Sequence, residues 1–143
     1  ALGAHHVLLY PQATPERVRE LSDGGVATVF DGVGKDTFDS SLSSLARRGS
    51  MVLFGAASGP VPPVDPHRPI SAGPVFLTRP TLADFIATTE EFRDRASEVL
   101  EGIVDGTLRL QVGATYGLSQ AADAHRALQA RGTTGSIVLA PLR

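Results

Sequence analysis

Apolar and polar positions alternate along this chain in blocks that predict short β-strands joined by amphipathic α-helices. The apolar run over 7–10 predicts a buried strand, and the segment 26–30, apolar on both faces, predicts a central parallel strand. From Phe38 onward, apolar residues recur at spacings of four and three, which predicts a helix before another apolar strand over 50–54. Strands and helices that alternate through short turns indicate an α/β fold with a doubly wound parallel sheet.

Residues that favour helix ends place the boundaries of the first two helices. Thr14 followed by Pro15 is typical of a helix start. Asp36 is expected to cap the second helix. Arg47 and Arg48 are expected in the last turn of that helix, where the helix dipole favours cations.

The second half of the chain begins with an irregular segment. The many prolines between residues 60 and 74 predict a surface loop, and the segment 75–79 predicts a further strand. Thr88 and Glu91 have the spacing of a capping box, which predicts the start of the longest helix.

The last third predicts two strands around a helix. Alternation over 108–112 favours a strand with one wet face. Ser119 is expected to cap an alanine-rich helix, and the segment 136–140 predicts the final strand.

Composition narrows the class of protein. The 143 residues are 42% hydrophobic and 20% charged, which is ordinary for a globular domain. With a net charge of -2, the chain offers no basic field for nucleic acid or anionic lipid. The sequence contains neither an 18-residue apolar run nor cysteine, so we expect no membrane partner, no thiolate metal site and a cytoplasmic location.

The histidines do not predict a metal site. His5 and His6 are adjacent on a predicted strand, so they point to opposite faces and cannot share one ion. His67 lies in the proline-rich loop, and His125 lies on an amphipathic helix, where a packing role is expected. No G-x-S-x-G nucleophile motif occurs, and the catalytic residues stay unknown.

Two predicted strands run into turns of small residues, Asp31–Gly34 and Gly55–Gly59. In open parallel sheets, ligands bind beyond the carboxyl ends of the strands, and glycine lets a flat ring or a ribose approach the backbone. Tight turns between strand and helix need glycine for structural reasons too. The spacing alone therefore leaves open whether these turns bind a ligand or are only tight turns of the fold.

Five motifs occur in order and cover essentially the whole chain: FDGVGKDTF at 30–38, LARRGSMVLFG at 45–55, FLTRPTL at 76–82, AHRAL at 124–128 and RGTTG at 131–135. Together they resemble the carboxyl-terminal part of the zeta-crystallin-like quinone oxidoreductases. These are zinc-independent members of the medium-chain dehydrogenase/reductase superfamily. The resemblance implies a partial Rossmann fold with a C-terminal helix–strand return segment. Residues 1–112 would be the C-terminal part of the Rossmann cofactor-binding domain, and 113–143 the return segment belonging to the GroES-like catalytic domain.

The resemblance also implies which residues contact the cofactor, NADP in its reduced form, NADPH. Gly32 and Val33 would lie near the nicotinamide ribose and the pyrophosphate, with the nicotinamide end against Phe54, Gly55, Ala56 and Ala57. Tyr10 would lie on the adenosine side, although a tyrosine that only packs its ring at a strand end is also open. Arg131 would reach the cofactor across the cleft, or act only on the helix dipole.

This sequence departs from the family at two of these positions. Relatives often have Ser where Gly32 stands and Asn where Ala56 stands. Each loss removes a side-chain hydrogen bond of about 0.5–1.5 kcal/mol, so weaker cofactor binding is expected.

The implied activity is hydride transfer from NADPH to a small-molecule quinone or related enone. Ala1–Ala4 resemble the end of a helix with its glycine turn, so the chain is expected to begin inside a longer domain and to be catalytically incomplete. The alternative is a non-catalytic nucleotide-binding or dimerisation module. In either case a homodimer is expected through the edge strand near Val75–Thr78, as in the family.

Overall fold

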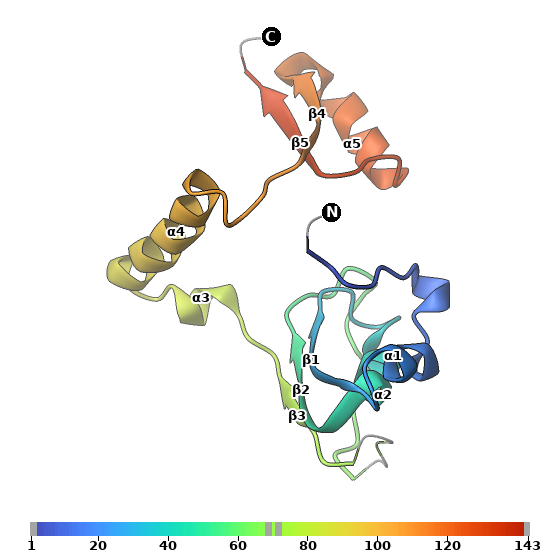
Figure 1. The fold of residues 1–143 in the computed structure, drawn as a ribbon. Helices are drawn as coiled ribbons and strands as arrows, with labels where there is room; N and C mark the ends of the chain where they lie inside the picture. Colours follow the sequence, from blue (N-terminus) through green and yellow to red (C-terminus); the bar gives the residue numbers. More distant parts are fainter. Residues whose placement is uncertain (1–2, 68–69, 71–72, 142–143) are drawn as a thin grey trace. The chain divides into compact units, whose positions relative to one another are not determined.

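The computed structural model describes residues 3–67, 70 and 73–141, which form two compact units (Figure 1). The first unit covers Gly3–Ala87 and the second covers Thr88–Arg143. Within the described residues, the first unit has a three-stranded sheet and the second a two-stranded sheet, and all strand pairs are parallel. Parallel strands with helices between them confirm the predicted α/β class.

The first unit holds the elements that follow one another up to residue 85. In chain order they are the 3₁₀ helix η1 (Tyr10–Gln12), α1 (Pro15–Leu21), β1 (Val26–Asp31), α2 (Phe38–Ser44), β2 (Leu45–Leu53), β3 (Phe76–Thr78) and α3 (Leu82–Phe85). The strand order is β1-β2-β3. The strands predicted over 26–30, 50–54 and 75–79 are therefore confirmed, but β2 already begins at Leu45, in the segment predicted as the end of the helix.

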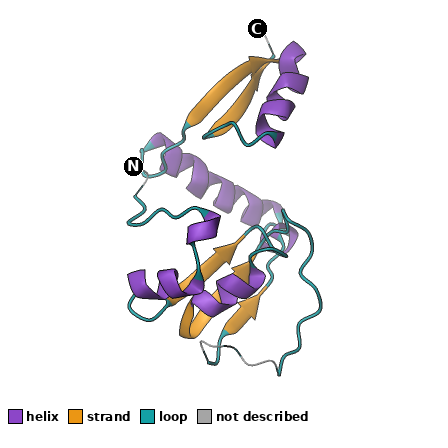
Figure 2. Ribbon diagram, turned by 90° about the vertical axis from the view of Figure 1, so that its right-hand side faces the viewer, coloured by secondary structure: helices purple, strands orange, loops and turns teal. Residues whose placement is uncertain are grey.

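One face of this sheet carries the core. α1 and α2 lie on that face in both views (Figures 1 and 2), and the proline-rich loop adds Val61 and Val64 at the rim. The core side chains come from α2 and β2, namely Phe38, Leu42, Leu45, Met51 and Leu53. Residues 60–74 have no helix or strand in their described part, as the prolines predict.

The opposite face of the same sheet is open in the described residues. Phe30 of β1 and Phe76 of β3 are 71% and 65% exposed, and the strand pairing places both on this face. β1 lies at an edge of the described sheet, so the prediction of a central strand is wrong for these residues.

Three local predictions in the first unit are wrong. No strand forms over 7–10, where Val7 and Leu9 are exposed and have no partner strand in the described residues. Asp36 does not cap α2, because the N-cap position belongs to Thr37. Arg47 and Arg48 follow the end of α2 at Ser44 and lie within β2, at the register shift of the β1–β2 pairing.

The start of α1 is confirmed. The Thr14 hydroxyl accepts a hydrogen bond from the backbone N–H of Arg17 at 3.3 Å, and Pro15 occupies the first helical position.

The second unit contains one long helix and a β-α-β unit. Its elements are α4 (Thr89–Val104), β4 (Val112–Gly117), the 3₁₀ helix η2 (Leu118–Gln120), α5 (Ala121–Gln129) and β5 (Ser136–Ala140). The capping box is confirmed, because the Thr88 hydroxyl accepts from the N–H of Glu91 and the Glu91 carboxylate accepts from the N–H of Thr88.

Two boundaries in this unit differ from the predictions. The strand predicted over 108–112 begins only at Val112 and runs to Gly117, because this segment pairs in parallel with β5. Ser119 lies inside η2, and Gln120 occupies the N-cap position of α5. The final strand is confirmed at 136–140.

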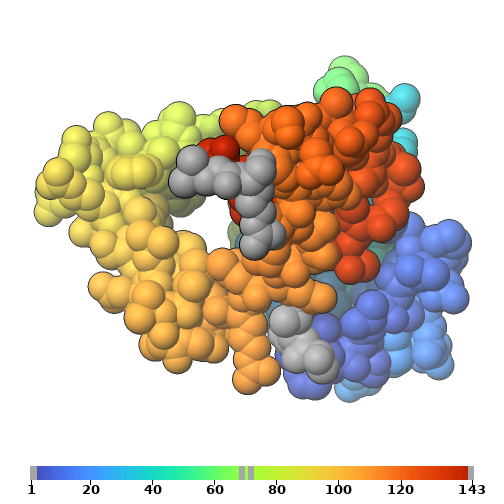
Figure 3. All heavy atoms as spheres, turned by 90° about the horizontal axis from the view of Figure 1, so that it is seen from above, coloured from blue at the N-terminus to red at the C-terminus, as the bar shows by residue number. Residues whose placement is uncertain are grey.

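Burial is scarce in the second unit. Of its described residues only Gly117 and Ala124 are buried, while Phe92, Leu100 and Val104 of α4 are exposed. The open surface of α4 is visible in yellow and light orange (Figure 3). Among the described residues, no helix has the length and apolar character needed to cross a bilayer.

Candidate functional site

The candidate site is built from the two turns that follow β1 and β2. Asp31, the last residue of β1, is paired with Leu53, the last residue of β2, so both turns leave the same edge of the sheet. This edge is the carboxyl end of the parallel strands, where α/β proteins bind ligands. The first turn, residues 31–37, leads into α2, and the second turn, residues 54–59, leads into the proline-rich loop.

Backbone hydrogen bonds join the two turns. The N–H of Ala57 donates to the carbonyl of Gly32 at 3.2 Å, and the N–H of Ser58 donates to the carbonyl of Val33 at 2.8 Å. The Ser58 hydroxyl donates to the same Val33 carbonyl at 2.8 Å and accepts from the N–H of Asp36 at 3.0 Å. The two turns therefore act as one rigid surface, called here the turn platform.

Two glycines are required by the packing within the turn platform. A Cβ on Gly55 would lie 2.5 Å from the carbonyl oxygen of Gly32, and a Cβ on Gly34 would lie 2.8 Å from the carbonyl of Gly59. Gly34 also has a φ of +88°, which side chains disfavour. The structural explanation for Gly34 and Gly55 therefore holds whether or not a ligand binds.

Gly32 differs, because its neighbour is a side chain. A Cβ there would lie 2.9 Å from the tip of the Phe54 ring, which is 60% exposed. The ring therefore occupies the space that a side chain at residue 32 would take. Ala56 and Ala57 are also exposed, and Val33 is half-buried.

The predicted residues on the outer surface of the turn platform have apolar, uncharged side chains or none, and all except Phe54 are small. This chemistry fits the uncharged ring of a reduced nicotinamide. The structure thus brings together Gly32, Val33, Phe54, Gly55, Ala56 and Ala57, six of the eight predicted residues. These residues can position and shield a ring, but they include no acid or base.

The remaining two predicted residues lie elsewhere. Tyr10 begins η1, and its side chain is 71% exposed. Arg131 belongs to the second unit, directly after α5, with a positive φ of 54° that is unusual for a residue other than glycine. Its N–H donates to the carbonyl of Leu128 at 3.1 Å.

Asp31 is the polar residue of the site that the sequence patterns did not single out. Asp31 as a whole is 4% exposed, and its carboxylate accepts hydrogen bonds from the N–H groups of Val33 and Gly34 and from the hydroxyls of Thr37 and Ser41. Burial alone would raise the pKa of Asp31, but the bonds from Gly34, Ser41, Thr37 and Val33 together hold it below its ordinary value. An Asp at a strand end, two residues before the N–H it accepts from, is the signal that could have revealed this turn.

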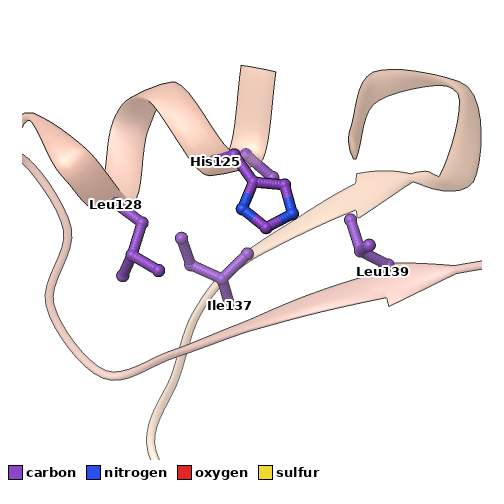
Figure 4. A pocket seen from close by; sticks show the side chains of 5 residues that line it. His125, Leu128, Ile137 and Leu139 are labelled. Atoms are coloured by element: carbon purple, nitrogen blue, oxygen red, sulfur yellow. The ribbon is translucent and has the colours of Figure 1, made fainter. Parts of the chain in front are cut away.

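A separate hollow lies in the second unit, between α5 and β5. His125 and Leu128 border it from the helix, and Ile137 and Leu139 from the strand (Figure 4). At about 160 Å³ it is smaller than the roughly 300–1,000 Å³ of common small-molecule sites. His125 is exposed rather than packed away. In the described residues, no group of three His, Asp or Glu is placed to hold a metal ion.

Comparison with protein families gives one match over nearly the whole chain. The family model described as zinc-binding dehydrogenase matches residues 2–139. A curated quinone oxidoreductase of Salmonella typhimurium is 41% identical over 143 residues, which are 97% of this chain and 44% of that protein. The chain therefore spans less than half the length of this relative.

Solved structures give the same coverage. A mycobacterial protein solved with NADPH is 55% identical with a TM-score of 0.85, over 97% of this chain and 44% of that one. The quinone oxidoreductase of Escherichia coli, also solved with NADPH, is 38% identical with a TM-score of 0.85 and the same coverage.

Proposed function

This chain belongs to the zinc-binding dehydrogenase family, and from that membership we propose that it supplies the carboxyl-terminal, cofactor-binding part of an NADPH-dependent quinone oxidoreductase. The resemblance to quinone oxidoreductases and the partial Rossmann fold are confirmed by the likeness to the Escherichia coli enzyme. The observation that carries the proposal is the turn platform, a preformed surface at the carboxyl edge of a parallel sheet that is uncharged at the six predicted residues.

In this proposal the turn platform holds the nicotinamide end of NADPH. Phe54, Gly55, Ala56 and Ala57 contact the ring, while Gly32 and Val33 lie near the ribose and the pyrophosphate. NADPH, when bound, supplies the hydride. The chain positions the cofactor and keeps water from one side of its ring, which is the usual contribution of a protein to hydride transfer.

Two further contacts complete the proposed cofactor site. Tyr10 packs on the adenosine side, and its largely exposed ring leaves room for that contact. Arg131 supplies a cation, and its positive φ supports a role beyond helix capping, because glycine would hold that turn with less strain. The missing serine at Gly32 and asparagine at Ala56 weaken binding relative to enzymes that have them.

The proposed division of the chain follows the family. Residues 1–112 belong to the Rossmann domain, and 113–143 form the return segment of the GroES-like catalytic domain. The support is that β4, α5 and β5 form a β-α-β unit that begins at Val112.

The activity does not require zinc in this proposal. The support is the resemblance of the five motifs to the zinc-independent quinone oxidoreductases. The proposed location is the cytoplasm, which is supported by the ordinary composition and the absence of a long apolar run in the sequence.

The proposed oligomer is a homodimer through β3. β3 lies at the edge of the described sheet, and its Phe76 and Leu77 are exposed. Such an edge can pair with its copy across a two-fold axis. Light scattering of the chain at rising concentration is expected to give the mass of a dimer, and a monomer at every concentration would rule the homodimer out.

The activity test uses the 143-residue chain, NADPH and a small quinone, with the loss of reduced-cofactor absorbance as the readout. We expect NADPH binding in a titration but no turnover, because the turn platform is one wall of a site whose other parts this chain does not contain. Robust turnover would contradict the incomplete site. No NADPH binding at millimolar concentration would instead favour a non-catalytic dimerisation module.

A further inference from the structure

Asp31 is a buried carboxylate that the proposed chemistry does not use. Asp31 is 4% exposed, and burying a carboxylate is unfavourable unless hydrogen bonds replace the water that it loses. Other groups of the protein therefore have to replace the lost hydration of a charge at the end of β1. A neutral residue at this position would not need such replacement.

The compensation comes entirely from neutral donors. Oδ1 accepts from the N–H of Val33 at 2.8 Å and from the N–H of Gly34 at 3.0 Å. The Thr37 hydroxyl lies within 2.9 Å of both carboxylate oxygens, and the Ser41 hydroxyl donates to Oδ2 at 2.7 Å. One side chain thus ties the strand end, the first turn and α2 together.

The backbone of Asp31 holds the second turn. Its carbonyl accepts from the N–H of Phe54 at 3.0 Å and from the N–H of Gly55 at 3.3 Å. The Val33 carbonyl of the first turn also accepts hydrogen bonds from the N–H and the hydroxyl of Ser58 in the second turn. Asp31 therefore contacts the first turn through its side chain and the second turn through its main chain.

We propose that Asp31 is a positioning residue for the cofactor, whose carboxylate fixes the first turn and, through it, the orientation of the second turn against the nicotinamide. This inference rests on the proposed function. The Asp31 carboxylate touches neither cofactor nor substrate; it acts through the Val33 and Gly34 amides and the Ser58 contact. The low pKa supports the geometry, because it keeps the carboxylate ionised and all its donors engaged near neutral pH.

The test compares Asp31→Ala and Asp31→Asn with the matched control Asp36→Asn in the 143-residue chain. Asn keeps an oxygen that can accept from Val33 and Gly34 but removes the charge, whereas Ala removes every acceptor. The control makes the same chemical change at an exposed side chain five residues along the same turn.

The first readout is amide hydrogen exchange without cofactor, followed residue by residue by NMR. For Asp31→Ala we expect exchange at least ten-fold faster at Val33, Gly34, Ala57 and Ser58, with the amides of β2 unchanged. Asp31→Asn should give a smaller increase, of about three-fold, and Asp36→Asn none. Unchanged exchange at Ala57 and Ser58 in Asp31→Ala, or an equal rise throughout β2, overturns the inference.

The second readout is the NADPH dissociation constant from a fluorescence titration. We expect it to rise at least ten-fold in Asp31→Ala, about three-fold in Asp31→Asn, and not at all in Asp36→Asn. Wild-type affinity in Asp31→Ala overturns the positioning role even if exchange changes. If the wild-type chain binds no NADPH, the proposed function is wrong, and so is the positioning role of Asp31. The hydrogen-exchange result is independent of NADPH, and it fails only if Asp31 does not order the second turn. Should Asp31→Ala unfold, Asp31→Asn decides by the same two readouts.

Discussion

The two units of this chain differ most in how much apolar surface they bury. In the first unit five large apolar side chains from α2 and β2 are buried, whereas in the described part of the second unit only Ala124 and Gly117 are. The turn platform sits directly on that core, because its turns extend from β1 and β2. The turn of Arg131 has no comparable support within its own unit.

This difference teaches where a preformed site can exist. A surface that must hold a cofactor ring in one orientation needs turns whose amides and carbonyls are already paired. The turn platform meets this condition through contacts of the first unit alone. The Arg131 turn is held by a helix-end hydrogen bond and by the close approach of Thr134 to Gly113, and it keeps a strained φ. The predictions below test this contrast, beginning with the largest effect.

The largest effect is expected from truncating the core of the first unit. Leu42→Ala should lower the free energy of unfolding by about 2–5 kcal/mol, because Leu42 is 2% exposed and the cavity cannot collapse fully. The matched variant Leu128→Ala, at a position 56% exposed in the second unit, should cost less than about 1 kcal/mol. Urea denaturation measures both. Equal losses would mean that the second unit has a core of similar quality.

The next effect concerns the packing of the two turns. Gly55→Ala should destabilise the chain by about 1–3 kcal/mol and weaken NADPH binding, because the new methyl group would lie 2.5 Å from the backbone oxygen of Gly32. Gly132→Ala is the control, since the nearest neighbour of its Cβ, the Ala127 oxygen, is 4.0 Å away. Thermal melting and NADPH titration of both variants check this. A Gly55→Ala protein that binds like wild type would show that the turns need not pack as described.

A smaller effect is the acid sensitivity that Asp31 gives to the first unit. Its pKa is lowered in the folded state, so its contribution to stability is complete above the ordinary Asp pKa of about 3.9 and is lost as the pH falls through the folded-state value. The charged groups beside it, Lys35 and Asp36 on the turn and Asp39 on α2, are exposed.

The difference in unfolding free energy between wild type and Asp31→Asn should therefore be largest at neutral pH and shrink toward pH 3. Urea denaturation of both proteins between pH 3 and pH 7 measures this difference. A difference that does not change with pH would show that the charge of Asp31 contributes nothing.

The smallest effect on stability is expected at Arg131 in the second unit, where one substitution tests both its backbone strain and its proposed contact with the cofactor. Arg131→Gly should raise stability by up to about 1 kcal/mol, because glycine adopts a φ of 54° without steric cost. NADPH binding should fall about ten-fold, as expected for one charge-assisted hydrogen bond. Arg48→Gly is the control, since Arg48 has a φ of 64° but no proposed contact with the cofactor. If both variants bind NADPH like wild type, Arg131 is not a cofactor residue.

Much of the fold could be predicted because the signals are local. Thr14 and Thr88 mark helix starts through side-chain bonds that span only three residues, and both starts are confirmed. The errors lie where a distant partner decides the outcome. Residues 7–10 form no strand because no described strand pairs with them, and 112–117 form one because β5 does.

The candidate site shows the same division. The small-residue turns were predicted as the site, and the structure brings six of the predicted residues together there. The role of Ser58 was not predictable from spacing alone, since its partners are 22 and 25 residues away in sequence. The partners of the Asp31 carboxylate are near in sequence, and its place at a strand end is the signal that could have revealed them.

The sequence by itself determined most of the strands and helices, the two glycine-rich turns and, through five motifs, the family. These features depend on periodicity and short-range bonding, which neighbouring residues encode. Only the tertiary structure decided that Gly55 must be glycine because of Gly32, and that Asp31 holds the first turn through its carboxylate and the second turn through its carbonyl. The reason is that the pairing of β1 with β2 sets which turn atoms meet, and that register is a property of the assembled sheet.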